Sequence, residues 1–335
     1  MKVVSGHVFQ ASDLNAAGRP PGLSAFMRIR NGADFVEATI RSHVGFFDEI
    51  VAVYNQCTDA TPALLGRLEQ AIGPKLRVFH YTDRVFPPGS SGHAATPATS
   101  PASMVNYSNF ALAMTSRRTV AKLDDDHIAI PGAVAPVISR LRESGGANGK
   151  MLCFSGINLF RAPGGRLGIL ARDPIAGSGD HGFFDVSEST FFTHDPRFER
   201  APRFRSKRMF CGFLYWHLKY MKVGLGFANY ELESNPRSRY AKRRAWFDGR
   251  PEVIELGELK RKVTPSHLAR AAALVSAKER ISVDRAAMLG ISFPENSVAA
   301  AVRRTVAPEF VEFIGLSADD AMAGRYALEG SQRVS

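Results

Sequence analysis

The sequence predicts an α/β fold in which a mostly parallel sheet is flanked by helices and followed by a small helical C-terminal region. Three features support this. Short apolar stretches alternate with helical patterns through the first 81 residues, an acidic triplet follows a later apolar stretch, and helical patterns dominate from residue 264 onward. The chain has 335 residues, of which 45% are hydrophobic and 22% charged, so it can form a large core.

The first strand and helix are predicted from periodicity. Residues 23–29 (LSAFMRI) form a short apolar stretch, as expected of a buried strand. Val36, Ile40 and Val44 then recur at steps of four, and Phe47 continues the same face, so a helix should follow.

Two further strands and a helix complete an alternating pattern. Residues 50–54 (IVAVY) are short and β-branched, which is typical of a buried parallel strand. A helix is predicted over 61–72, with Pro at its start and Gly73-Pro74 after its end. Residues 76–81 (LRVFHY) give the third strand. The order β-α-β-α-β indicates parallel strands joined by helical crossovers.

The rest of the chain is less regular. Residues 86–103 are rich in Pro, Gly, Ser, Ala and Thr and predict a long loop, either an active-site flap or a disordered insertion. A helix is expected near 103–116 and a short strand over 119–125. Residues 164–202 are rich in Gly, Asp and Phe and predict irregular structure.

Charge and cysteine content limit the class of protein. The net charge of +11 favours an anionic partner: nucleic acid, an acidic membrane face or an anionic ligand. Cys57, Cys153 and Cys211 are far apart, which favours neither a disulfide framework nor a zinc site. We therefore expect a reducing, cytoplasmic location. The N-terminus shows no signal-peptide pattern, and no apolar stretch is long enough to span a membrane.

The acidic triplet Asp124–Asp126 is the strongest functional motif. It follows the strand-like stretch TVAKL, so it should lie at the carboxyl edge of the sheet, where open α/β folds bind ligands. Alternate residues of an extended segment point the same way, so Asp124 and Asp126 can face one Mg²⁺ or Mn²⁺ while Asp125 points elsewhere. The alternative is a solvated acidic turn.

Three stretches together resemble a GT-A-fold (Rossmann-like) glycosyltransferase similar to family 2. The first, residues 26–61, is FMRIRNGADFVEATIRSHVGFFDEIVAVYNQCTDAT. The second, residues 106–126, is NYSNFALAMTSRRTVAKLDDD, which ends in an Asp-x-Asp motif. The third, residues 213–222, is FLYWHLKYMK. The resemblance covers roughly residues 23–225 and implies an enzyme.

The resemblance implies a metal-dependent reaction of a nucleotide diphosphate sugar. Asp126 would be a direct ligand of Mn²⁺ or Mg²⁺, Asp124 would lie near the ion or the ribose, and His217 would be a further ligand. The alternative for His217 is a core residue. It also implies a catalytic domain over 1–230, with a donor half at about 23–130 and an acceptor half at about 131–230, followed by a basic, mainly helical region over 231–335.

Several residues are candidates for contacts with the nucleotide. Where the family commonly has Asp after the second strand, this chain has Tyr54 and Asn55, which can stack on the base or hydrogen-bond to it. Asp59 matches a later Asp of the family loop, but it can also cap the next helix. Asp83 follows the third strand and can contact the base or serve as a turn residue.

The phosphates need other partners. Arg28 and Arg30 end the first strand at the edge expected to meet the nucleotide, and Arg30 can hold a phosphate or the base. Lys219 and Lys222 can meet the diphosphate as point charges. The alternatives are a surface ion pair for the arginines and solvated lysines. Asp125 is included with Asp124 among the nucleotide contacts.

A general base is harder to assign from the sequence. Asp180 stands between glycines in SGDHG, which loosely matches the acidic motif where the family often places its base. Asp185 and Glu188 are rivals, and a structural turn is the remaining option.

The segment 237–250 mixes Arg and Lys with Tyr240, Trp246 and Phe247. This combination suits a membrane interface, single-stranded nucleic acid or a solvated helix. Lipid-linked acceptors are common in the resembled family, so peripheral association with the inner, anionic membrane face is the second option.

The sequence therefore favours an inverting, metal-dependent glycosyltransferase acting on a saccharide or lipid-linked acceptor, in bacterial surface polysaccharide or glycolipid assembly. One alternative is a basic nucleic-acid- or membrane-binding protein without catalysis. No nucleic-acid-binding module is found, so no nucleic acid is expected. Another is a nucleotidyltransferase, but the usual Gly-rich phosphate loop after the first strand is missing. A non-catalytic relative that binds nucleotide sugars is the fourth.

Overall fold

The computed structural model describes residues 1–177, 181–200, 208–249 and 251–316. Within these residues, twelve strands form one sheet in the order β1-β4-β3-β2-β5-β10-β7-β13-β6, with β8 and β9 paired to β7 and β14 paired to β8. The strands of this sheet are β1 (Lys2–Val4), β2 (Leu23–Ile29), β3 (Glu49–Asn55), β4 (Leu76–Tyr81), β5 (Thr119–Leu123), β6 (His127–Ala129), β7 (Met151–Arg161), β8 (Leu167–Leu170), β9 (Ile175–Ala176), β10 (Gly182–Asp185), β13 (Arg208–His217) and β14 (Val253–Ile254). A separate hairpin joins β11 (Thr193–Asp195) to β12 (Phe198–Arg200).

Helices cover both faces of the sheet. They are α1 (Val36–His43), α2 (Thr61–Ile72), α3 (Ser91–Ala95), α4 (Met104–Ala113), α5 (Pro131–Glu143), α6 (Arg239–Arg244), α7 (Leu256–Lys262), α8 (His267–Ala272), α9 (Ala277–Ser292), α10 (Val298–Thr305) and α11 (Pro308–Val311). Alternate strand residues face opposite sides. Met27 therefore packs in the core under α1, α2 and α5, whereas Phe26 packs in the core under α4.

The parallel half of the sheet confirms the predicted alternation. β1, β4, β3, β2 and β5 are parallel to one another. β2, β4 and α2 have the predicted bounds, and β3 is one residue longer at each end. The periodicity succeeds here because each strand is buried on both faces and each helix on one.

The second half of the sheet is mixed. β10 is antiparallel to both β5 and β7, and β13 is parallel to β7 but antiparallel to β6. The irregular segment predicted over 164–202 contains the short strands β8 to β12. The loop predicted over 86–103 is not a disordered insertion, because it contains α3, which the Ser90 side chain caps by accepting from the His93 amide at 3.0 Å.

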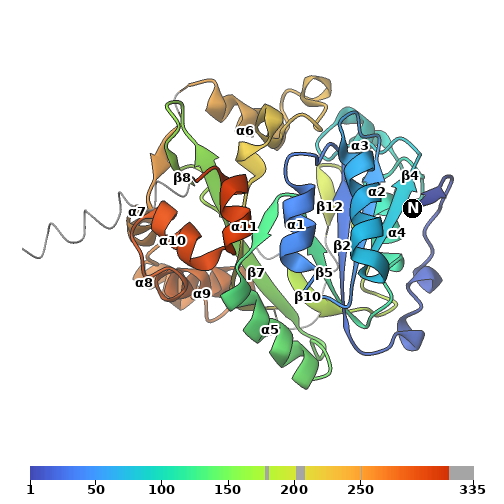
Figure 1. The fold of residues 1–335 in the computed structure, drawn as a ribbon, viewed down its shortest axis with the longest axis horizontal. Helices are drawn as coiled ribbons and strands as arrows, with labels where there is room; N and C mark the ends of the chain where they lie inside the picture. The colour runs from blue at the N-terminus through green and yellow to red at the C-terminus, as the bar shows by residue number, and fades with distance from the viewer. Residues whose placement is uncertain (178–180, 201–207, 250, 317–335) are drawn as a thin grey trace, which may run out of the picture.

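The C-terminal helices share a core with the sheet. Figure 1 shows α7 to α11 gathered at the end of the sheet that carries β7 and β8, away from α2 and β4. Trp216 of β13 is fully buried among apolar side chains of these helices, including Leu289 and Val302. Its indole Nε1 donates to Thr305 Oγ1 at 2.9 Å. The region after residue 230 is therefore packed on the strand that carries His217.

Replacing this tryptophan tests the shared core. We expect Trp216→Ala to lower the free energy of unfolding by about 3–5 kcal/mol, because a large buried side chain and a buried hydrogen bond are lost. The matched control is Trp246→Ala, since Trp246 is the other of the two tryptophans and is half-buried. Urea unfolding monitored by circular dichroism measures both. An equal loss of unfolding free energy in the two variants would contradict the inference that the C-terminal helices share a core with the sheet.

Candidate functional site

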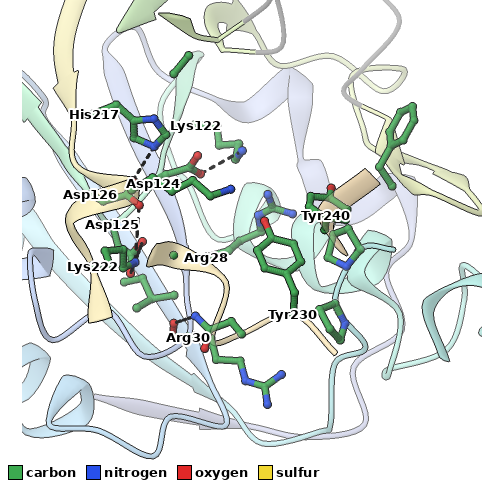
Figure 2. A pocket seen from close by; sticks show the side chains of 18 of the residues that line it. Arg28, Arg30, Lys122, Asp124, Asp125, Asp126, His217, Lys222, Tyr230 and Tyr240 are labelled. Carbon is green, nitrogen blue, oxygen red and sulfur yellow. Dashed lines mark hydrogen bonds and ion pairs between the residues drawn. The ribbon is translucent and has the colours of Figure 1, made fainter. Parts of the chain in front are cut away.

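A cavity of about 820 Å³ opens at the carboxyl ends of β2 and β5. Figure 2 shows its acidic side, with Asp124, Asp125, Asp126 and His217, facing Arg28, Tyr230 and Tyr240. It lies where the parallel half of the sheet meets the mixed half. Side chains from the turns after β2, β3, β5 and β13, from β12 and from the start of α6 line the cavity.

Strand register places the acidic triplet. β5 ends at Leu123, which lies beside Met27 of β2, so the following residues emerge at the sheet edge next to Arg28. The three carboxylates lie in the turn between β5 and β6. Asp125 and Asp126 are buried, whereas 34% of the Asp124 side chain is exposed.

Each carboxylate faces its own cation or imidazole. Lys122 Nζ lies 3.1 Å from Asp124 Oδ1, and Lys222 Nζ lies 2.9 Å from both oxygens of Asp125. His217 Nε2 lies 3.1 Å from Asp126 Oδ1. All three carboxylates line the cavity, and Lys222 binds Asp125 most closely, with Asp126 Oδ2 3.7 Å away.

Gly32 makes room for Asp125. A Cβ atom at this position would lie 2.2 Å from Asp125 Oδ2, so no other residue fits without a shift. The backbone amide of Gly32 donates to Thr61 Oγ1 at 2.8 Å, which fixes the turn after β2 against the start of α2. The Arg-Asn-Gly turn therefore supports the acidic triplet rather than binding phosphate through a glycine-rich loop.

The His217 ring is oriented by a polar partner on each side. Its Nδ1 contacts Asn158 Oδ1 at 2.5 Å, and with the proton on Nδ1 the lone pair of Nε2 faces Asp126. Asp126 Oδ1 is buried and accepts no hydrogen bond. A lone pair facing a carboxylate oxygen is stabilised by a cation held between them, so this pair fits a divalent metal.

The pKa values of the carboxylates follow from their neighbours. Burial alone would raise the pKa of Asp126, but His217 and Lys222 hold it well below its usual value. Burial also opposes ionisation of Asp124, but Lys122 and His181 lower its pKa. Burial raises the pKa of Asp125 to about 6, with Lys222 opposing the shift and Asp126 adding to it. Asp124 and Asp126 are therefore the carboxylates held ionised, as metal ligands must be.

His127 belongs to the same cluster and was missed in the sequence. One ligand atom each from Asp124, His127 and His217 lie within 4.8 Å of one another. The His127 ring is fully buried and stacks on Tyr215 with 3.7 Å between ring centroids. Burial, followed by the neighbouring His217, holds the pKa of His127 well below the usual range. The one feature of the sequence that could have identified His127 as a site residue is its position directly after the acidic triplet.

The predicted nucleotide contacts divide into two groups. Asn55 lines the cavity, and its Nδ2 donates to the backbone oxygens of Tyr81 and Asp83. Tyr54 does not line it: the ring packs in the core under α1 and α2, stacks on His80 at 4.5 Å, and its hydroxyl meets Met1 Sδ. Since Tyr54 is buried on the helical face, it is placed wrongly for stacking on a base.

Asp59 and Asp83 have structural partners. Asp59 accepts from the backbone amides of Thr61 and Ala33, both at 3.0 Å, so it caps the start of α2 and holds the turn after β2. Asp83 accepts from the amide of Gly6 at 2.7 Å. Neither is among the described residues that line the cavity. The contacts of Asp59 are therefore those of the helix-capping alternative, and the contact of Asp83 is that of the turn-residue alternative.

Lys219 and Arg30 are among the cavity cations that lack an acidic partner in the described part of the chain. Lys219 Nζ lies 5.2 Å from the ring centroid of Tyr230 and 5.4 Å from that of Phe227. Burial lowers the Lys219 pKa, with the charge of Asp126 opposing. The buried Nε of Arg30 has no hydrogen-bond partner. By contrast, Arg28 pairs with Glu199 at 2.7 Å. Lys219 and Arg30 are thus available for an anionic ligand.

The candidate bases have different placements. Asp180 lies outside the described residues. Asp185 accepts from Thr119 Oγ1 at 2.6 Å and from the amides of residues 147 and 148, so it is a structural residue of β10. Glu188 is exposed and is not among the described residues that line the cavity. Asp173 and Glu199 do line it, but no sequence pattern singles them out, because both lie in the segment expected to be irregular.

The basic segment 237–250 faces the cavity in part. Tyr240 is buried and stacks on Tyr230 with 4.4 Å between centroids, and Arg239 and Arg243 line the cavity. These side chains belong to the site, so the interpretation of the whole segment as a membrane or nucleic-acid surface is wrong for them. In the described part of the chain, no helix has the length and apolar character needed to cross a bilayer.

Comparisons with known proteins give only distant similarities. Neither a family model nor a curated protein matches the sequence. The chain is similar to a solved structure of S. aureus TarS 1-349 in complex with UDP, with 16% identity, a TM-score of 0.28, and coverage of 43% of this chain and 37% of that one.

It is also similar to glucosyl-3-phosphoglycerate synthase from M. tuberculosis in complex with Mn²⁺, UDP and phosphoglyceric acid, with 19% identity, a TM-score of 0.24, and coverage of 48% of this chain and 51% of that one. The chain therefore spans about half or less of the structures it matches. Because the TM-scores are this low, the function has to be argued from the site itself.

The buried ion pair between Lys222 and Asp125 generates a pH-dependent prediction. We expect Lys222→Met to lower the free energy of unfolding by about 3–5 kcal/mol near pH 8, because a buried carboxylate loses its partner. The raised pKa of Asp125 means that its ionisation already costs stability as pH rises from 3.8 to about 6. Near pH 5 Asp125 can bind a proton instead, so the loss should be smaller there.

Urea unfolding at the two pH values measures this difference. The control is the double variant Lys222→Met/Asp125→Asn, which has no buried charge and should recover part of the loss near pH 8. The same loss at both pH values, with no recovery in the double variant, would show that the ion pair does not determine stability here.

Proposed function

We propose that this protein is a metal-dependent glycosyltransferase that moves a sugar from a nucleotide diphosphate sugar to an acceptor hydroxyl. One observation carries the proposal: a carboxylate–imidazole cluster (Asp124, Asp126 and His217) shares a cavity with two cations that have no described acidic partner (Arg30 and Lys219). A divalent ion and a diphosphate are the complementary pair of ligands for such a cavity.

The residues take distinct roles in this proposal. Asp126, His217 and Asp124 hold Mn²⁺ or Mg²⁺, which as a Lewis acid stabilises the negative charge of the leaving diphosphate. Lys219 and Arg30 contact the phosphates, and Asn55 lies where the base would enter. Asp125 and Lys222 fix the turn that carries the ligands. The acceptor oxygen bonds to the anomeric carbon as the bond from that carbon to the diphosphate oxygen breaks.

The acceptor proton passes to a carboxylate in an inverting reaction. We propose Asp180 for this role; among the described cavity residues, Asp173 and Glu199 are the alternatives. Asp173 accepts from the Tyr220 hydroxyl at 2.5 Å, and Glu199 is engaged by Arg28. Since both have partners, each would have to exchange a hydrogen bond to act as a base.

We further propose a saccharide or lipid-linked acceptor, in surface polysaccharide or glycolipid assembly in the cytoplasm or at the inner face of the membrane. All three cysteines are free thiols, as suits a reducing compartment. The excess positive charge suits an anionic lipid surface.

A donor screen tests the reaction. We expect the purified protein to release nucleoside diphosphate from one member of a panel of nucleotide sugars with Mn²⁺, and not with EDTA. Asp126→Ala should lose at least about 100-fold of this activity, because the buried metal ligand is removed. Turnover of no donor, together with no metal-dependent nucleotide binding by calorimetry, would remove the transferase proposal.

A second experiment tests the phosphate contact. We expect Lys219→Met to weaken binding of the nucleoside diphosphate identified by the screen by about 10- to 100-fold, because a charge-assisted contact is lost. Binding of the corresponding nucleoside should not change. Lys242→Met is the matched control, since Lys242 is exposed and outside the cavity lining. Equal weakening of nucleoside and diphosphate would place Lys219 away from the phosphates.

A further inference from the structure

We propose that His127 is a direct ligand of the metal, so that two imidazoles join the carboxylates of Asp124 and Asp126 around the ion and select a transition metal over Mg²⁺. The proposal shares the metal site of the proposed function, but it concerns which ion is bound and by which atoms. Three independent features of His127 carry it: its register, its unpartnered ring and its place beneath the cavity.

Strand register puts the two histidines side by side. β6 and β13 are antiparallel, and His127 lies directly opposite His217. Directly opposed residues project from the same face of a sheet. Their ring centroids are 5.1 Å apart, and Asn158, which orients His217, lies opposite it on β7. The sheet itself therefore presents both imidazoles to the acidic turn.

The His127 ring has no hydrogen-bond partner in the described structure. It is 0% exposed, and neither Nδ1 nor Nε2 makes a hydrogen bond. Other buried histidines do have partners: His43 Nδ1 contacts Thr39 O at 2.8 Å, and His93 Nε2 contacts Asp195 O at 3.0 Å. Burying a polar ring without a partner costs free energy, and binding an ion through Nε2 would remove the part of that cost that comes from Nε2.

The position of His127 would let it bind the metal ion from the side of the sheet. It is not among the described residues that line the cavity, whereas Asp124 and His217 are. Its Nε2 lies 3.9 Å from Asp124 Oδ2, close to the separation of about 4 Å that opposite ligands of one ion reach. An ion here would be held from the sheet side by imidazole, which leaves the cavity side to phosphate oxygens and Asp126.

The donor set determines the metal. Imidazole suits Mn²⁺, Fe²⁺, Co²⁺ and Zn²⁺, whereas Mg²⁺ prefers oxygen ligands and keeps much of its water. A site with one imidazole and two carboxylates accepts Mg²⁺ readily. A site with a second, desolvated imidazole favours the transition metals.

Calorimetric titration of the metal-free protein with MnCl₂, CoCl₂ and MgCl₂, without nucleotide, tests the assignment. We expect Co²⁺ and Mn²⁺ to bind more tightly than Mg²⁺, and His127→Phe to weaken Co²⁺ and Mn²⁺ by at least about tenfold. The phenyl ring keeps the stack on Tyr215. The matched control is His43→Phe, another buried histidine, which should leave metal affinity unchanged. Unchanged Co²⁺ affinity in folded His127→Phe would overturn the proposal.

X-ray absorption of the Zn²⁺- or Co²⁺-loaded wild type provides a test that does not depend on a variant folding. Two imidazoles are expected around the ion, and a single imidazole would overturn the proposal. The count should fall to one in His127→Phe, so a count that stays at two would assign the second imidazole elsewhere and also overturn it. If the protein turns over a donor but binds the ion through one imidazole, the proposed function holds and the assignment of His127 fails. If two imidazoles bind the ion but no donor is turned over, the assignment of His127 holds and the proposed function fails.

Discussion

The structure depends most on three adjacent carboxylates at the end of β5, of which Asp125 and Asp126 are buried. In a low-dielectric interior, like charges at this spacing are tolerated only with compensating cations. The compensation comes from Lys122 on β5 and from His217 and Lys222 nearly a hundred residues later. The end of β13 therefore has to lie beside the turn after β5, and the antiparallel pairing of β6 with β13 secures this.

The sequence predicted the features that depend on local pattern. Strand and helix periodicity identified β2, β4 and α2 with their bounds, and the triplet after a strand located the cavity edge. These predictions needed no knowledge of distant partners. Alternation along an extended segment does not describe the triplet, because residues 125 and 126 form a turn and all three carboxylates line the cavity.

The predictions that failed required long-range contacts. Tyr54 ends a strand at the correct edge, but whether it faces the cavity or the helices depends on strand parity, which a single sequence does not fix. Asp59 was matched to a family position, yet its local chemistry as a helix cap prevails. Asp173 and Glu199 reach the cavity from a turn and a short strand, which have no hydrophobic periodicity that would predict them. His127 was not predicted as a site residue because the Asp-x-Asp motif directly before it was taken as the complete acidic site.

The cations that line the cavity differ in whether a carboxylate neutralises them. Arg28, Lys122 and Lys222 are neutralised by Glu199, Asp124 and Asp125 inside the cavity, so they contribute little to an external field. Arg30 and Lys219 are not neutralised by any carboxylate of the described chain. Lys219 also lies over aromatic rings, whose faces stabilise a cation without neutralising it. Positive potential is thereby concentrated next to the carboxylate–imidazole cluster. That arrangement suits a ligand whose compact negative charge is bound together with a metal ion.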